Sequence, residues 1–190
     1  MKIGVYGSAD GQIKEEVYLK ARELGREIAR RRHVLVTGAC PGLPQEAVLG
    51  AYELRGTCIG FSPARSRGEH IQRDKFPVKG FSKLIFVPGV YRHADEPLVC
   101  RKYRNIESVY FVDVGVIIGG RTGTMNEFTL LYDSGKNIGV LRGTGGIAER
   151  AINVLVQDID KSRGSRIIYS DSHIVLLDEL ERLSIPDHNI

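Results

Sequence analysis

The sequence predicts an α/β fold: a Rossmann-like, doubly wound, mainly parallel sheet of about six to seven strands flanked by helices. Short apolar runs alternate with amphipathic helical patterns along the chain, which implies a parallel sheet covered by helices on both faces. Turns rich in Gly, Ser or Thr follow several of the runs, where such sheets bind their ligands. We expect one domain over residues 1–190, because this length suffices for one substantial core.

The first half of the chain is expected to supply four strands and two helices. Each strand is a short apolar run, such as IGVYG at 3–7, and the first helix carries Val17, Leu24 and Ile28 at a spacing consistent with one face. The expected strands cover 3–7, 33–38, 57–62 and 83–89, and the expected helices cover 12–32 and 43–54. The connection at 62–82 is longer than usual, so it is either functional or mobile.

The second half contains the strongest strand signal, the run VGVIIGG at 114–120, which is apolar until it ends in two glycines. The expected helices cover 95–112, 124–135 and 147–157, and the other expected strands cover 137–141 and 173–177. Together with the four earlier strands, these runs define the expected size of the sheet.

The bulk composition favours a small anionic ligand over other partners. The net charge of +4 and the pI near 9.0 are mildly basic, but the basic residues are scattered and match no DNA- or RNA-binding motif, so we expect no nucleic-acid partner. No apolar run is long enough for a bilayer and the N-terminus does not resemble a signal peptide, so we expect a cytoplasmic protein without a membrane partner. The cysteines and histidines show no metal-ligand spacing, so we expect reduced thiols and no metal.

The turn after the strand at 114–120 is the main candidate site. It places backbone N–H groups at the start of a helix, where their partial positive charge favours a phosphate, and its glycines allow close approach. The candidate phosphate-binding residues of this turn are Gly119, Gly120, Arg121, Thr122, Gly123 and Thr124. A purely structural alternative exists, because Thr124 and Glu127 also have the spacing of a capping box.

Two more glycine turns are expected at the same edge of the sheet. Gly7 and Ser8 follow the first strand, and Gly38 and Gly42 follow the second. Neither turn carries the GxGxxG fingerprint or the GxxxxGK[ST] pattern of nucleoside-triphosphate binding, so each is a weak signal alone. Three such turns at the strand ends of one sheet make a phosphorylated, nucleotide-like small molecule the leading ligand.

The long connection at 62–82 carries four cations, Arg65, Arg67, Arg73 and Lys75. They suit a lid that closes over a phosphate, although exposed basic loops are commonly just solvated. The sequence leaves both interpretations open.

The pattern strand–Gly-Gly-x-x-Gly-Thr-x-x-Glu at 119–127, with Arg104 and Asn105 upstream, resembles the LOG ("lonely guy") family. It resembles more closely the bacterial and archaeal Rossmann-like relatives of that family in the SLOG superfamily, and the molybdenum cofactor carrier proteins. The resemblance covers residues 1–142 and leaves 143–190 as a C-terminal extension.

The resemblance implies a phosphoribohydrolase. In such enzymes water attacks C1′ of a nucleoside 5′-monophosphate and releases the free base and ribose 5-phosphate. The resemblance makes Glu127 the catalytic carboxylate and Arg104 the residue that orients it or binds the substrate. A cation so close is expected to lower the pKa of Glu127 and keep it ionised. The resemblance also implies a homodimer or higher homo-oligomer, and it requires no cofactor.

Two positions depart from the family pattern. Gly119 stands where the family has proline, and Arg121 replaces the second glycine of its Gly-Gly pair. Arg121 either adds a contact to a phosphate or blocks the pocket. The alternative to an enzyme is therefore a non-catalytic carrier or sensor of a nucleotide or molybdopterin-type cofactor.

Overall fold

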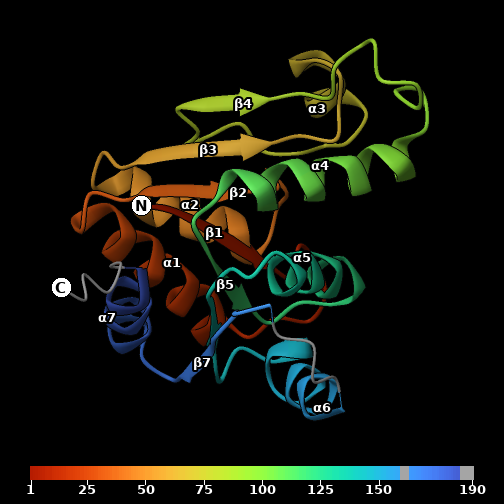
Figure 1. Cartoon of the computed structure of the whole chain (residues 1–190). Coiled ribbons are helices and arrows are strands. Elements are labelled where there is room, and N and C mark those ends of the chain that lie inside the picture. Colours follow the sequence, from red (N-terminus) through yellow and green to blue (C-terminus); the bar gives the residue numbers. More distant parts are fainter. Residues whose placement is uncertain (159–162, 185–190) are drawn as a thin grey trace, which may run out of the picture.

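The computed structural model of the chain describes residues 1–158 and 163–184. Within them, a seven-stranded sheet runs through the molecule in the order β4-β3-β2-β1-β5-β6-β7, and every neighbouring pair is parallel (Figure 1). The strands are β1 (Lys2–Gly7), β2 (Val34–Thr37), β3 (Thr57–Phe61), β4 (Lys83–Ile85), β5 (Val114–Ile118), β6 (Ile138–Leu141) and β7 (Ile167–Ser170). The predicted Rossmann-like α/β fold is confirmed.

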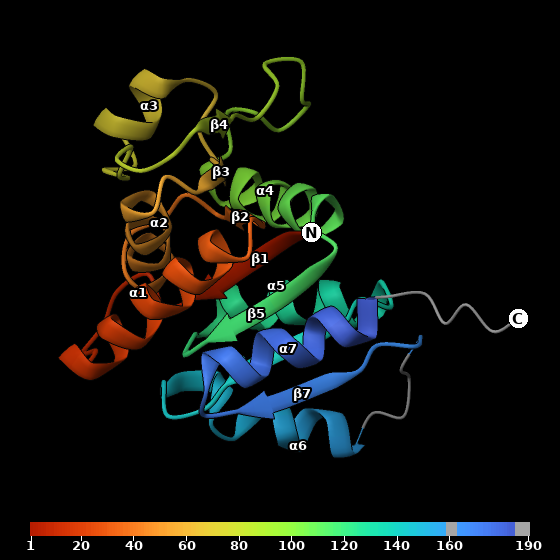
Figure 2. The same cartoon turned by 90° about the vertical axis from the view of Figure 1, so that its left-hand side faces the viewer.

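Helices cover both faces of the sheet, because alternate residues of each strand point to opposite faces. One core cluster joins the sheet to α1 (Glu15–Arg30), α2 (Leu43–Glu53) and α7 (His173–Ser184). The other joins it to α4 (Pro97–Phe111), α5 (Thr122–Asp133), the short 3-10 helix η1 (Gly146–Ala148) and α6 (Ala151–Asp158). A further helix, α3 (Arg67–Gln72), lies beside β4 at the end of the molecule opposite α6 and β7 (Figure 2).

The strand order places a switch point between β1 and β5. The chain builds β1 to β4 outward in one direction, returns through α4, and builds β5 to β7 in the other. Gly7 lies opposite Ile118 in the β1–β5 ladder, so the turns that follow these two strands begin side by side. A crevice at such a point is where open α/β sheets bind ligands.

One predicted element is wrong. The run HIVLL at 173–177 is not the last strand but the start of helix α7, and the last strand is β7. Leu176, Leu177 and Leu180 are buried at helical spacing, whereas the first five residues alone are too short to distinguish a strand from a helix. The segment 62–82 also contains α3, where no regular structure was expected. No helix among the described residues is long and apolar enough to cross a membrane.

Candidate functional site

A cavity of about 740 Å³ opens at the switch point, on the carboxyl edge of the sheet. Its walls come from the turns after β1, β2 and β5, from α4 and α5, and from Phe76 in the connection after α3. The cavity therefore lies where the sequence predicts the ligand.

The structure brings most of the predicted site residues to this cavity. The residues that line it are Gly7, Ser8, Gly38, Arg104, Arg121, Thr122, Gly123, Thr124 and Glu127. Three others do not line it: Gly42, Gly119 and Gly120. These three glycines shape the turns, whereas the first group can contact a ligand.

The turn at Gly119 and Gly120 uses its own N–H groups within the protein. Gly119 N donates to Thr144 Oγ1 at 2.8 Å, and Gly120 N donates to Ser8 Oγ at 2.8 Å. Both residues have positive φ, +62° and +96°, which favours glycine. Ser8 thus joins the turn after β1 to the turn after β5.

Residues after 142 hold the same turn from the other side. Ile147 N donates to the Gly120 carbonyl at 3.0 Å, and Ala148 N donates to the Gly119 carbonyl at 3.2 Å. Thr144 is buried and its hydroxyl donates in turn to the Leu141 carbonyl. The C-terminal segment therefore contributes to the shape of the site, although it lies outside residues 1–142, which carry the resemblance.

The N-terminus of α5 faces the cavity. The helix begins at Thr122, and its first backbone bond runs from Met125 N to the Arg121 carbonyl at 2.8 Å. The N–H groups of Thr122, Gly123 and Thr124 precede that bond, so the helix itself offers them no acceptor. The capping-box alternative is wrong, because Thr124 lies inside the helix and not at its cap.

Glu127 and Arg104 form a buried ion pair that lines the cavity. Arg104 Nη1 lies 3.2 Å from Glu127 Oε1, and the two side chains are only 10% and 8% exposed. Burial raises the pKa of Glu127 to about 7, while Arg104 and, more weakly, Lys102 lower it. The expectation of a net lowering is wrong, because loss of hydration outweighs the nearby cation.

Gly38 makes room for this arginine. A Cβ atom at position 38 would lie 1.5 Å from Arg104 Nη1, so any side chain there would displace the guanidinium. Gly42 is required for a different reason, because its φ is +76° and a Cβ there would lie 2.3 Å from the Ser8 carbonyl oxygen. The two glycines of the second turn therefore position Arg104 and the first turn.

Asn105 lines the cavity beside Arg104, and the sequence names it only within the Arg-Asn dipeptide of the resemblance, without a role. Its amide lies 3.3 Å from Glu127 Oε1 and 3.1 Å from the Arg101 carbonyl oxygen, and both atoms accept hydrogen bonds. The amide nitrogen of Asn105 is therefore assigned to the position that faces these two oxygens, and it donates to Glu127 Oε1 and to the Arg101 carbonyl. The Arg-Asn dipeptide of the resemblance was the available signal, but the contact depends on α4 packing against α5.

Arg121 lies at the rim of the cavity. Its φ of −133° is extended, so the backbone needs no glycine at this position. The side chain is 62% exposed and forms an ion pair with Asp10 from the turn after β1. The two residues span the rim between the turns that follow β1 and β5.

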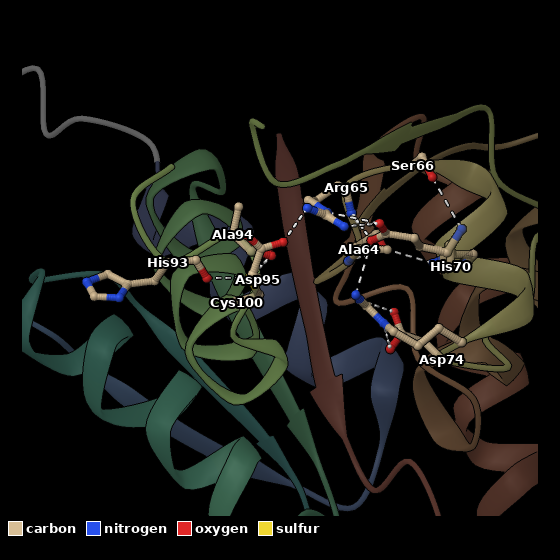
Figure 3. Close-up of polar contacts among 12 residues, drawn as sticks. Ala64, Arg65, Ser66, His70, Asp74, His93, Ala94, Asp95 and Cys100 are labelled. Carbon is tan, nitrogen blue, oxygen red and sulfur yellow. Dashed lines mark hydrogen bonds and ion pairs between the residues drawn. The ribbon is translucent and has the colours of Figure 1, made fainter. Parts of the chain in front are cut away.

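The basic connection at 62–82 does not bring its cations to the cavity. Arg65 pairs with Glu69 and Asp95, as Figure 3 shows for Asp95, and Arg73 pairs with Asp74 and Glu69. In the described part of the chain, no cation of this connection lines the cavity. The segment instead contributes an aromatic side chain, Phe76.

The fold and the site define a Rossmann-like protein with a ligand cavity at the switch point of a parallel sheet, bordered by a helix N-terminus and a buried Arg–Glu pair. The chain belongs to the SLOG cluster4 family, whose model matches residues 1–176. The predicted SLOG membership is confirmed, and the match continues beyond residue 142 into α7.

Individual proteins are also similar to this chain. An uncharacterized protein of Archaeoglobus fulgidus is 28% identical over 142 residues, which are 75% of this chain and 80% of that protein. The solved structure of TM1055 has a TM-score of 0.78 and 25% identity, with 95% of this chain and 98% of that chain covered. The molybdenum cofactor carrier protein MCP from Chlamydomonas reinhardtii shares the fold, with a TM-score of 0.69, 24% identity, and 96% and 97% covered.

Proposed function

We propose that the cavity binds a phosphorylated, nucleotide-like ligand, and that the protein hydrolyses the N-glycosidic bond of a nucleoside 5′-monophosphate to free base and ribose 5-phosphate. The buried Arg104–Glu127 pair beside the N-terminus of α5 carries this proposal. It supplies a carboxylate for the reaction close to a site for the phosphate.

The phosphate binds at the start of α5. The N–H groups of Thr122, Gly123 and Thr124 point toward an anion at this end of the helix, and the helix dipole favours negative charge there. The charges of the lining support this: four cationic side chains (Arg101, Lys102, Arg104, Arg121) face two carboxylates (Asp10, Glu127).

Glu127 acts as the general base. Its Oε1 accepts from Arg104 and Asn105, whereas the described residues give its Oε2 no hydrogen bond, so Oε2 contacts the water. The water oxygen bonds to C1′ as its proton moves to Oε2. The C1′–N bond breaks and its electron pair leaves with the base, which takes up a proton from solvent, while Glu127 returns to solvent the proton that it accepted from the water. A pKa of about 7 keeps a useful fraction of Glu127 ionised at neutral pH.

The assay incubates the purified protein with AMP, GMP, CMP, UMP and a cytokinin nucleotide, and measures ribose 5-phosphate. We expect release with at least one of them, and a loss of about 10²- to 10⁴-fold in Glu127→Gln, which keeps the shape of the side chain. Glu107→Gln is the matched control, because Glu107 is exposed on α4 and should leave the rate unchanged. Release that never exceeds the Glu127→Gln background rules out the hydrolase.

The second candidate is a non-catalytic carrier or sensor of a nucleotide or molybdopterin-type cofactor. The Arg121–Asp10 pair at the rim favours it, because the family pattern has a glycine where Arg121 stands. The shared fold with a molybdenum cofactor carrier adds support. Calorimetry that shows binding of a phosphorylated ligand by a protein without turnover distinguishes this candidate from the hydrolase.

The protein is also proposed to be a homodimer. Two apolar side chains, Ile106 and Tyr110, are 43% and 66% exposed along α4. A second copy of the chain would bury them. A cytoplasmic location and the absence of a nucleic-acid partner remain predictions from the sequence.

A further inference from the structure

We propose that Phe76, together with Pro41, Pro44 and Leu98, forms the wall that holds the aromatic heterocycle of the ligand. This inference rests on the proposed binding of a nucleotide-like ligand and does not require hydrolysis. It assigns the two ends of the cavity to the two ends of the ligand.

The strand order gives the cavity two different ends. Thr122, Gly123 and Thr124 follow β5, whereas Pro41 and Pro44 follow β2 and Phe76 follows β3 along the chain. β1 lies between β2 and β5, so the two ends are about 10 Å apart at the usual strand spacing. A ligand with its phosphate on α5 extends across β1 and places its other end on the apolar wall.

Phe76 lies in the connection between α3 and β4, and two contacts hold it in place. Its N–H donates to the His70 carbonyl at 3.0 Å, and its ring meets the His70 ring edge to face, with centroids 5.7 Å apart. His70 is fully buried. The phenyl ring is therefore fixed through both its backbone and its ring contact.

The contacts of His70 fix that ring in turn. Its Nε2 lies 3.0 Å from the Pro77 carbonyl, which can only accept, so Nε2 carries the proton. Its Nδ1 then accepts from the Ser62 hydroxyl at 2.9 Å, while Ser62 Oγ accepts from Ala64 N at 3.0 Å. Every donor and acceptor in this chain of hydrogen bonds is matched, so the His70 ring that supports Phe76 is held in place.

The wall is also tied to α4, which carries Arg104. Arg65 bridges Glu69 of α3 and Asp95 of the loop before α4, and Figure 3 shows the pairing of Arg65 with Asp95. The segment that carries Phe76 is thereby linked to the loop that leads into the helix of the catalytic pair.

The chemistry of the wall defines what it recognises. The side chains of Pro41, Pro44, Phe76 and Leu98 carry no hydrogen-bonding group. They contact the face of a ring and do not read its edges, as aromatic side chains do when they stack on bases of any kind. The wall therefore selects a base by ring area, with purines above pyrimidines and little difference between adenine and guanine.

The test measures binding of AMP, GMP, CMP and ribose 5-phosphate by calorimetry to the full chain carrying Glu127→Gln, so that hydrolysis cannot consume the ligand. Phe76→Leu is added to this background. We expect a loss of about 5-fold for AMP and GMP, the lower end of the cost of removing a stacking ring because leucine stays apolar, a smaller loss for CMP, and no loss for ribose 5-phosphate. Unchanged ribose 5-phosphate binding also shows that the variant is folded.

Phe86→Leu is the matched control, because Phe86 also contacts the His70 ring, with centroids 6.3 Å apart, but does not line the cavity. It should leave all four affinities unchanged. Equal losses for AMP and ribose 5-phosphate in Phe76→Leu, or no loss for AMP, overturn the assignment of the wall. Failure of the parent protein to bind any of the four overturns this assignment and the proposed phosphate site together. Base-dependent binding without turnover in the unsubstituted protein overturns only the hydrolysis.

Discussion

Glu127 is a carboxyl group on which burial and a neighbouring cation act in opposite directions. Full hydration loss raises its pKa to about 7, and Arg104 at 3.2 Å prevents a larger rise. A carboxyl group with a pKa near neutrality can take and return a proton at physiological pH.

The first prediction concerns stability. The folded-state pKa of Glu127 is above its ordinary value, so the folded protein binds more protons than the unfolded chain between about pH 4.5 and 7. This group therefore lowers stability as the pH rises through that window. Glu127→Gln removes the effect. The free energy of unfolding of the variant minus that of the wild type should therefore increase by on the order of 3 kcal/mol from about pH 5 to about pH 8. Urea unfolding at several pH values checks this, and a pH-independent difference contradicts it.

The second prediction concerns the origin of the Glu127 pKa. Because Arg104 lowers it more than Lys102 does, Arg104→Met should move the titration midpoint of Glu127 clearly above 7. Lys102→Met should move it in the same direction by less. Carbon-13 NMR of the glutamate carboxyl groups, assigned with Glu127→Gln, measures both midpoints. An unchanged midpoint in Arg104→Met would show that the ion pair is not the dominant charge effect.

The third prediction concerns Gly38. An alanine Cβ would overlap Arg104 Nη1, so Gly38→Ala should displace the guanidinium, cost about 1–3 kcal/mol of stability, and shift the Glu127 titration as Arg104→Met does. Gly89→Ala is the control, because a Cβ at Gly89 would meet no atom within 4 Å. Urea unfolding and the same NMR titration are measured for both glycine variants. A Gly38→Ala protein that behaves like Gly89→Ala contradicts the positioning role.

At the scale of elements, the turn at Gly119 and Gly120, between β5 and α5, is held in place by two distant parts of the chain. Ser8 binds Gly120 from the turn after β1, and Thr144 binds Gly119 from the segment after β6. The glycines themselves could be predicted from the sequence, because two glycines between an apolar run and a helix indicate a tight turn. Their partners could not, because residues that are 25 and 112 positions away become neighbours only through the sheet order.

The fourth prediction tests the hydrogen bond between Thr144 and this turn. Thr144→Val removes the hydroxyl that accepts from Gly119 N and leaves a buried N–H group unpaired, so we expect a loss of about 1–3 kcal/mol in the free energy of unfolding. Ligand affinity at the neighbouring α5 N-terminus should fall with it. Thr144→Ser keeps the hydroxyl and should recover both. Urea unfolding and calorimetry provide the two readouts, and equal behaviour of the valine and serine variants would refute the role.

For the whole molecule, the sequence was sufficient for the fold class and for the edge at which the cavity lies. Strand–helix alternation and glycine turns are local patterns, and they correctly indicated a parallel sheet with a cavity at its strand ends. The run at 173–177 was misassigned because its burial depends on α7 packing against the sheet. The sequence gives Asn105 no role and does not indicate Phe76, because only the packing of α4 and of the connection after α3 brings them to the cavity.

The fifth prediction concerns assembly. Light scattering coupled to gel filtration should give twice the chain mass, and Ile106→Glu should give a monomer because it places a charge in the proposed interface on α4. Ile174→Glu is the matched control, since Ile174 is 48% exposed on α7. A monomeric wild type, or dissociation by both variants alike, contradicts the proposed interface.

The central claim is that the cavity at the switch point holds the phosphate of a nucleotide on α5 and its C1′ beside Glu127. A crystal structure of the Glu127→Gln protein with AMP tests it most directly. We predict the phosphate within hydrogen-bond distance of the Thr122, Gly123 and Thr124 N–H groups, with C1′ facing the side chain of residue 127. AMP bound elsewhere, or bound here with its phosphate away from α5, would contradict the account.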